Sequence, residues 1–246
     1  MKLVLLKPRN IGFLTRLIKE NLTNKILKKP ELTNSVKEYI LNNASRNNPQ
    51  SVLDVMDQYA KKERFLMNVG DVKGKILIKE LTKLRENPVV LELGCFCGYS
   101  AILMAKNLGD KGKIISIEVD INYAKVAREI IDFAGLKHII TIIEGSSKEI
   151  IPTLEDKFDL VFIDHWKDLY KRDLIAIEES GILKKGSVIF ADNVGKLISA
   201  LVGEKGNSNN YLDYVRNHAK FESTNIKTSL EYSNAEDEVE ISIYTG

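Results

Sequence analysis

The alternation of short apolar runs with helical stretches, which begins at Pro88, constrains the fold more than any other feature of this 246-residue chain. A strand buried on both faces of a parallel sheet appears in sequence as a continuous apolar run, and the helices between such strands cover the sheet. We therefore predict an α/β fold with a mostly parallel sheet and helices on both faces. The predicted strands are Val89–Leu93, Ile114–Val119, Ile139–Ile143, Leu160–Ile163 and Val188–Ala191, and the predicted helices are Ala101–Leu108, Tyr123–Phe133, Ser147–Leu154 and Leu169–Glu179.

The last part of the chain has a different pattern. A helix is expected near Tyr211–His218, and the runs Lys227–Tyr232 and Val239–Tyr244 are strand-like on either side of the polar segment SNAEDE. Two such runs around a polar turn predict an antiparallel hairpin. We expect this hairpin to extend one edge of the parallel sheet.

The first 33 residues form a basic extension ahead of the predicted domain, 34–246. Eight lysines and arginines lie between Met1 and Pro30, opposed only by Glu20, with apolar residues among them. We expect a helix here, and three interpretations stay open: an amphipathic helix that packs on the domain, a targeting segment, or a membrane-surface helix. No apolar run approaches the ~20 residues that a membrane-spanning helix requires.

The segment between this extension and Pro88 is predicted to be mostly helical. Val36–Leu41 and Val52–Tyr59 carry apolar residues at helical spacing, and Asn34 and Ser51 are plausible N-caps for them. Met67–Gly74, with the sequence MNVGDVKG, contains two glycines and is predicted to be a loop before a further helix.

Composition narrows the function classes. With 44% hydrophobic residues and 28% charged residues, the chain has the composition of a soluble globular protein, and a net charge of +2 is too small to imply a nucleic-acid or membrane surface by itself. Cys95 and Cys97 are too close in sequence to form a disulfide, and the three histidines show no metal-binding spacing. We expect a cytoplasmic monomer that acts on a small molecule.

A glycine-containing turn follows the first predicted strand. Glu92–Ser100, with the sequence ELGCFCGYS, lies where ligands bind in open α/β sheets, beyond the carboxyl end of a strand. It lacks the G-x-G-x-x-G pattern that cradles a pyrophosphate, whereas Gly94 and Gly98 allow close approach of a ligand without phosphate. Glu118 ends the second strand and could accept hydrogen bonds from ribose hydroxyls, although acidic residues at strand ends are common. Together these features predict a binding site for S-adenosylmethionine.

Polar residues also follow the fourth and fifth predicted strands. Asp164 comes directly after one, and Asp192 and Asn193 follow the other, at the same sheet edge as Gly94. Two carboxylates and an amide oxygen suit Mg²⁺, although aspartates at strand ends often cap the following helix instead. Lys167, three residues after Asp164, could serve as a base near a divalent cation.

From about Val36 onward the sequence resembles the catechol O-methyltransferase family. The shared segments are MNVGDVKG, LELGCFCGYS, FIDHWKDLY, GILKKGSVIFADNV and SLEY. The resemblance implies a Rossmann-like class I methyltransferase fold with a seven-stranded sheet. It also implies Mg²⁺-dependent transfer of a methyl group from S-adenosylmethionine to one hydroxyl of a catechol or related vicinal diol.

The resemblance assigns roles to individual residues. Asp164, Asp192 and Asn193 match the Mg²⁺ ligands, and Lys167 matches the general base. Glu231 matches the carboxylate that holds the second hydroxyl, and Met67, Trp166 and Tyr232 fall near the substrate and cofactor. The positions expected at the cofactor are Val69, Glu92, Gly94, Ser100, Glu118, Val119, Ser147 and Asp164.

The sequence departs from the family pattern around the substrate. Phe65 and Phe96 stand where the animal enzymes carry tryptophan and tyrosine, and Lys148 replaces a glutamine near the adenine. Gly195–Asn210 is longer than its counterpart and lacks a proline, and the basic extension has no match. The substrate and the methylated oxygen are therefore left open.

Three other functions compete with the leading one. A cation-dependent O-methyltransferase for a larger phenolic, such as a caffeoyl ester or a flavonoid, is the nearest alternative. A nucleic-acid methyltransferase has only the basic extension in its favour. A binding module without activity is disfavoured, because it would not need Asp164, Lys167, Asp192, Asn193 and Glu231 together.

Overall fold

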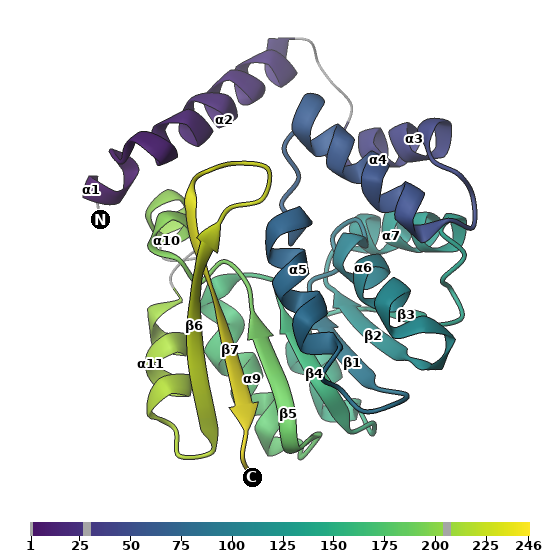
Figure 1. Ribbon diagram of the computed structural model, residues 1–246, viewed down its shortest axis with the longest axis vertical. Coiled ribbons are helices and arrows are strands. Elements are labelled where there is room, and N and C mark those ends of the chain that lie inside the picture. Colours follow the sequence, from purple (N-terminus) through teal and green to yellow (C-terminus); the bar gives the residue numbers. More distant parts are fainter. Residues whose placement is uncertain (1, 27–30, 204–207) are drawn as a thin grey trace.

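The computed structural model of the chain describes residues 2–26, 31–203 and 208–246. These residues form a seven-stranded sheet in the order β3-β2-β1-β4-β5-β7-β6 (Figure 1). The strands are β1 Val89–Leu93, β2 Lys113–Glu118, β3 Ile140–Glu144, β4 Phe158–Ile163, β5 Leu183–Ala191, β6 Phe221–Ser229 and β7 Glu236–Tyr244. The helices are α1 Lys2–Leu5, α2 Pro8–Ile26, α3 Leu32–Asn43, α4 Pro49–Lys62, α5 Gly70–Leu81, α6 Tyr99–Leu108, α7 Ile121–Phe133, α8 Ser147–Ile150, α9 Tyr170–Glu179, α10 Lys196–Val202 and α11 Asn209–Asn217.

The predicted parallel sheet is confirmed. β1 lies inside the sheet and pairs in parallel with β2 and β4, with Leu91 opposite both Ile115 and Val161. All five apolar runs are strands, and β4 is buried along its whole length. Because parallel strands end at the same edge, the turns after β1, β2, β4 and β5 meet there.

The core has two layers, one on each face of the sheet. Val90 of β1 packs with residues of α3, α4, α5, α6 and α7, whereas Leu91 and Leu93 pack with residues of α9 and α11 on the other face. This alternation follows from the two-residue period of a strand. It explains why these strands carry apolar residues on both of their faces.

Three boundaries before β1 differ from the sequence prediction. The N-cap of α3 is Glu31 rather than Asn34, and that of α4 is Asn48, whose side chain accepts a hydrogen bond from the Ser51 amide. Pro49 favours this earlier start because proline suits the first helical position. The predicted loop at Met67–Gly74 is wrong from Gly70 onward, where α5 begins. A Cβ on Gly74 would lie 2.8 Å from Leu103 of α6, so this glycine serves helix packing.

The predicted C-terminal hairpin is confirmed. β7 pairs antiparallel with both β5 and β6 and therefore lies between them. The strand expected at Lys227–Tyr232 is shifted: β6 ends at Ser229, and Leu230–Tyr232 belongs to the connection to β7. This connection carries Glu231 to the sheet edge where the other site residues lie.

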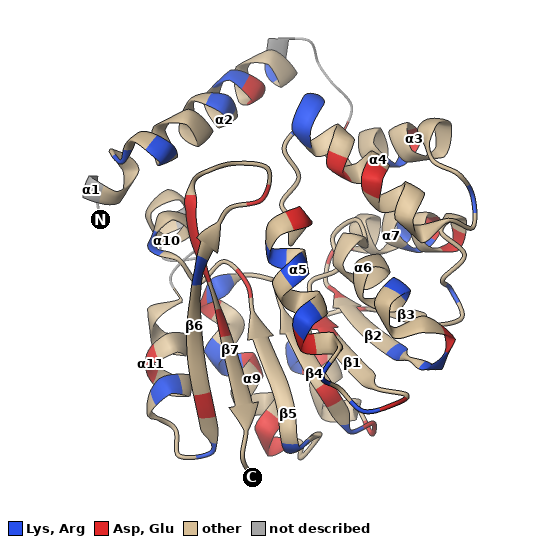
Figure 2. Ribbon diagram, in the orientation of Figure 1, with Lys and Arg blue, Asp and Glu red and all other residues tan. Residues whose placement is uncertain are grey.

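The basic extension contains α1 and α2, and α2 runs across the edge of the molecule (Figure 1). Phe13 is buried against Leu230 and Ala235, and Lys7 pairs with Glu236. Basic residues are spread along α2 (Figure 2), while Lys28 and Lys29 lie outside the described residues. The described helices include none with the length and apolar character needed to cross a membrane. The domain boundary at residue 33 stays a prediction.

Candidate active site

The glycine turn after β1 is built for close packing. Gly94 has a φ of +96°, and a Cβ at this position would lie 2.6 Å from the carbonyl oxygen of Asp164. Phe96 also has a left-handed backbone, with a φ of +49°. The Glu118 carboxylate accepts hydrogen bonds from the amides of Cys95 and Phe96 at 3.0 and 2.9 Å. Glu118 therefore holds the turn in a backbone conformation that residues other than glycine rarely adopt.

Glu92 lies behind this turn and is fully buried. Its carboxylate accepts hydrogen bonds from the hydroxyls of Ser100 and Ser116. Burial raises the pKa of Glu92 to about 7, more than the two hydroxyls lower it. The group is therefore able to change charge near neutral pH.

Lys167 connects two of the predicted metal ligands. It lies in a short 3-10 turn, Lys167–Leu169, and its Nζ donates hydrogen bonds to Asp164 Oδ1 at 3.2 Å and Asn193 Oδ1 at 3.4 Å. Nζ also donates to the Tyr170 hydroxyl at 2.7 Å, which itself donates to the Asp192 carbonyl at 3.0 Å. The oxygens of Asp164 and Asn193 thus lie close enough to share one cationic partner.

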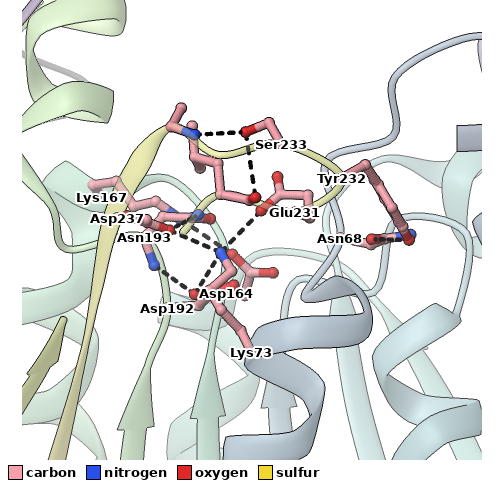
Figure 3. Close-up of polar contacts among 12 residues, drawn as sticks. Asn68, Lys73, Asp164, Lys167, Asp192, Asn193, Glu231, Tyr232, Ser233 and Asp237 are labelled. Carbon is pink, nitrogen blue, oxygen red and sulfur yellow. Dashed lines mark hydrogen bonds and ion pairs between the residues drawn. The ribbon is translucent and has the colours of Figure 1, made fainter. Parts of the chain in front are cut away.

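A second lysine, Lys73, connects the remaining acidic residues. It extends from α5 with no solvent exposure, and its Nζ lies 2.8 Å from Asp192, 3.0 Å from Glu231 and 2.9 Å from Asp237 (Figure 3). Burial opposes the charge of Lys73, but the three carboxylates outweigh it and raise its pKa well above its ordinary value. Asp237 also accepts a hydrogen bond from Asn193 Nδ2 at 2.7 Å. We call Lys73, Asp164, Lys167, Asp192, Asn193, Glu231 and Asp237 the acidic cluster.

The charges of the acidic cluster favour a divalent cation. Its four carboxylates and two ammonium groups leave a formal excess of two negative charges. Burial raises the pKa of Asp192 well above its ordinary value; Lys73 opposes this shift, and Asp164 and Asp237 add to it. Asp192 Oδ2 is buried with no hydrogen-bond partner among the described residues.

The donor set fits Mg²⁺ better than a soft metal. Asp164, Asp192 and Asn193 offer only oxygen, which suits a hard cation that keeps some water or substrate ligands. Within residues 2–26, 31–203 and 208–246, no group of three or more histidine, cysteine, aspartate or glutamate side chains is arranged as a metal site. A set of two carboxylates with the Asn193 amide as third ligand is consistent with the all-oxygen donors and with the lack of a group of three such side chains in the described residues.

A cavity of about 440 Å³ lies at this sheet edge. The glycine turn and part of the acidic cluster line this one space, so several residues that the sequence predicts at the cofactor and at the substrate lie in the same cavity. The predicted residues that line it are Met67, Gly94, Glu118, Val119, Asp164, Trp166, Lys167 and Asn193.

The other predicted residues are not among those that line the cavity, and they are buried: Val69, Glu92, Ser100, Ser147, Asp192 and Glu231. Ser147 donates a hydrogen bond to Asp173 at 2.6 Å, and Tyr232 donates to Asp57 and Asn68 at 2.8 and 2.9 Å. A Cβ on Gly70 would lie 2.6 Å from Glu231 Cβ, so this glycine lets the connection before β7 approach α5.

Sequence reasoning missed several residues of the site. Lys73 is part of the MNVGDVKG segment, and Asp237 is part of SNAEDE. Because the first segment was predicted to be a loop and the second a polar turn, nothing in the sequence indicated that either residue is buried. Leu17, Glu20, Asn21 and Asn24 of α2 also line the cavity, although the basic extension has no match in the family pattern.

Comparisons with known proteins agree with this geometry. A family model described as O-methyltransferase matches residues 42–216. Mouse catechol O-methyltransferase is 38% identical over 213 residues, which cover 85% of this chain and 77% of that protein. Zebrafish catechol O-methyltransferase B is 40% identical over 208 residues, which cover 82% of this chain and 75% of that protein.

Solved structures show the same fold. The O-methyltransferase TomG from Streptomyces achromogenes, in complex with SAM, has a TM-score of 0.65 at 22% identity and covers 92% of this chain and 96% of its own. An O-methyltransferase from Bacillus cereus in complex with SAH has a TM-score of 0.64 at 19% identity, with coverages of 93% and 97%. The fold is thus the Rossmann-like methyltransferase fold. Since the family model matches more than half of the chain and the animal relatives align over most of it, the chain belongs to the O-methyltransferase family.

Proposed function

We propose that this protein transfers a methyl group from S-adenosylmethionine to one hydroxyl of a catechol or related vicinal diol, with Mg²⁺ as cofactor and Lys167 as general base. The observation that carries the proposal is that Lys167 Nζ, inside the cavity, contacts both Asp164 and Asn193. A base and two of the three oxygen ligands therefore share one space with the glycine turn. The names of the mouse and zebrafish relatives support the diol as acceptor.

The cofactor would occupy the part of the cavity lined by Gly94, Glu118 and Val119. Glu118 offers its carboxylate to ribose hydroxyls, in addition to the amides that it holds. Gly94 leaves room for the methionine end because it has no side chain. The complexes of the Streptomyces and Bacillus proteins with SAM and SAH support this assignment of the ligand class.

Asp164, Asp192 and Asn193 would hold Mg²⁺, which lowers the pKa of a coordinated hydroxyl and fixes its direction. Lys167 Nζ, once it has lost its own proton, would accept the proton of the reacting hydroxyl, and Glu231 would hold the second hydroxyl. The oxygen then takes the methyl group, and the cofactor sulfur keeps the electron pair of the broken bond. The chain contributes mainly orientation, which is worth about 7–11 kcal/mol when reacting groups are well aligned.

A larger phenolic acceptor, such as a caffeoyl ester or a flavonoid, is the second candidate. The cavity favours it in one respect, because it extends beyond the acidic cluster to α2 and to Ile198 of α10. The segment Gly195–Asn210 includes residues 204–207, which lie outside the described residues. A cytoplasmic location and a monomeric state stay predictions.

The test is methyl transfer from labelled S-adenosylmethionine to catechol, measured with MgCl₂ and again with EDTA. We expect transfer with Mg²⁺ and its loss in EDTA. In Asp164→Asn the Mg²⁺ concentration for half-maximal rate should rise at least about tenfold, whereas Asp168→Asn, an exposed neighbour, should resemble the wild type. Undiminished transfer in EDTA would remove the metal from the proposal, and no transfer to any diol would remove the acceptor class.

A further inference from the structure

One wall of the cavity is made by α2, which lies before the residues 42–216 that the family model matches. Leu17, Glu20, Asn21 and Asn24 line the same space as Lys167. Phe13, Leu17, Glu20 and Asn24 follow one another at intervals of four, three and four residues, so they share one face of the helix. Figure 1 shows α2 crossing the end of the molecule above α5, α10 and the connection between β6 and β7.

The opposite face of α2 is turned to solvent. Ile11, Ile18 and Leu22 are exposed, with Ile18 at 63%. Leu17 and Ile18 are therefore adjacent in sequence, similar in size and opposite in environment. They form a matched pair for a test of the wall.

Polar contacts fix α2 to the segment that leads into the cavity. Glu20 accepts a hydrogen bond from the Phe65 amide at 2.8 Å and pairs with Arg16 at 2.6 Å. Arg16 also donates to the Ala60 carbonyl at the end of α4. The rings of Phe13 and Phe65 pack edge to face, with centroids 5.1 Å apart. These contacts join α2 to Phe65, which lies two residues before Met67 in the sequence.

Among the α2 residues that line the cavity, Leu17 is apolar, and Glu20, Asn21 and Asn24 are polar. Leu17, Phe65 and Ile198 belong to one apolar cluster, and all three line the cavity. A diol held by the acidic cluster therefore shares its cavity with a hydrocarbon surface that comes from three separate elements.

We propose that Leu17 is a specificity-determining residue: with Phe65 and Ile198 it receives the ring substituent of the acceptor and favours diols with uncharged, apolar substituents. This inference rests on the proposed function, since it takes a vicinal diol at the acidic cluster as its starting point. An apolar contact of this size discriminates by about 1–3 kcal/mol, or roughly 10–200-fold in kcat/KM.

The experiment compares Leu17→Ala and Leu17→Arg with the controls Ile18→Ala and Ile18→Arg. The kcat/KM is measured for catechol, 4-tert-butylcatechol and 3,4-dihydroxybenzoate at saturating S-adenosylmethionine. We expect Leu17→Ala to lower kcat/KM for 4-tert-butylcatechol about tenfold while that for catechol changes less than about twofold. Leu17→Arg should shift the preference toward the anionic 3,4-dihydroxybenzoate by a similar factor, a gain that misfolding cannot produce. Both Ile18 variants should retain the preferences of the wild type.

Trp166 supplies a readout that does not need turnover. It is the single tryptophan of the chain and lines the cavity, so its fluorescence reports binding of each diol in the presence of S-adenosylhomocysteine. If methyl transfer occurs but each Leu17 variant changes the kcat/KM for all three diols by the same factor, the specificity role of Leu17 is overturned and the proposed function stands. If no transfer occurs but Leu17→Arg reverses the binding preference between 4-tert-butylcatechol and 3,4-dihydroxybenzoate, the proposed function fails and the specificity role of Leu17 stands. If no diol binds, both fail.

Discussion

At the scale of single residues, Lys167 is the group whose position is most specific to a reaction. Its Nζ is held by Asp164, Asn193 and Tyr170 in the cavity, which is more restraint than a surface lysine receives. Asp164 and Asn193 are also the oxygens that we assign to Mg²⁺. In the proposed reaction, the neutral form of this lysine takes a proton from a hydroxyl that approaches the same oxygens.

Replacement of Lys167 by alanine should lower kcat by about 10²–10⁴-fold, the usual contribution of a general base. Binding of S-adenosylhomocysteine, measured by calorimetry, should change little, because the cofactor contacts lie at the glycine turn. Lys171→Ala, an exposed lysine on α9, is the control and should retain its turnover. A Lys167→Ala enzyme within about twofold of wild-type kcat would exclude the role as base.

Glu92 connects stability to pH. The folded protein retains the Glu92 proton up to about pH 7, whereas an unfolded chain releases it near 4.5. Between these values the unfolded state binds fewer protons, so the stability from this group is fully present below pH 4.5 and is lost as the pH rises to 7. The loss can reach about 3 kcal/mol.

Urea unfolding across this pH range tests the prediction. The free energy of unfolding of the wild type should fall with rising pH more steeply than that of Glu92→Gln, which carries no titrating group. Glu86→Gln, on an exposed position before β1, should follow the wild type. Parallel pH profiles for wild type and Glu92→Gln would show that Glu92 is ionised throughout.

At the scale of elements, Lys73 joins α5 to the end of β5, to the connection before β7 and to β7 itself. Its partners Asp192, Glu231 and Asp237 come from these three places. A buried ion pair contributes little net stability compared with apolar packing, but removal of one partner leaves buried charges uncompensated. The lysine therefore determines whether three elements can bring their carboxylates together.

Lys73→Met should lower the free energy of unfolding by about 3–5 kcal/mol, measured in urea without metal. The control Lys75→Met, exposed on the same helix, should stay within about 0.5 kcal/mol of the wild type. MgCl₂ should restore part of the loss in Lys73→Met, because a divalent cation compensates the same carboxylates. A variant as stable as the control would mean that the carboxylates are protonated and need no counter-charge.

The sequence predicted the elements well where burial leaves a periodic pattern. The strand β1 was predictable from its apolar run, and the turn after it from Gly94. Asp164 and Asn193 were predictable as site residues because they lie at strand ends. Lys73 could not be found in this way, because a buried lysine depends on partners more than 100 residues away in sequence. The role of α2 was equally hidden, since amphipathic spacing shows that a helix has an inner face but not which cavity that face lines.

At the scale of the whole molecule, the burial of the two cysteines shows that the glycine turn is shielded from solvent. Cys95 and Cys97 are exposed by only 2% and 1%, and burial raises the pKa of both thiols well above its ordinary value. A thiol of this kind reacts only after the structure around it opens. Both cysteines lie in the glycine turn, so a ligand bound there opposes the opening.

Modification by a disulfide reagent should be slow in the folded protein and fast in urea. S-adenosylhomocysteine at a hundred times its Kd should slow it by about a further hundredfold, because only the unliganded form opens. The rate of absorbance change at the released thiolate measures both effects, and Cys95→Ser and Cys97→Ser separate the two thiols. Rapid reaction of either thiol without urea would contradict the buried placement of the turn.

The position of β7 has a consequence for how the protein is made. A chain that leaves the ribosome from its N-terminus contains Lys73 and Asp192 well before Glu231 and Asp237 are translated. Until β7 is added between β5 and β6, β5 lacks its antiparallel neighbour and Lys73 lacks two of its three carboxylates. A nascent chain without β7 therefore lacks both the strand that joins β6 to the rest of the sheet and two of the carboxylates around Lys73.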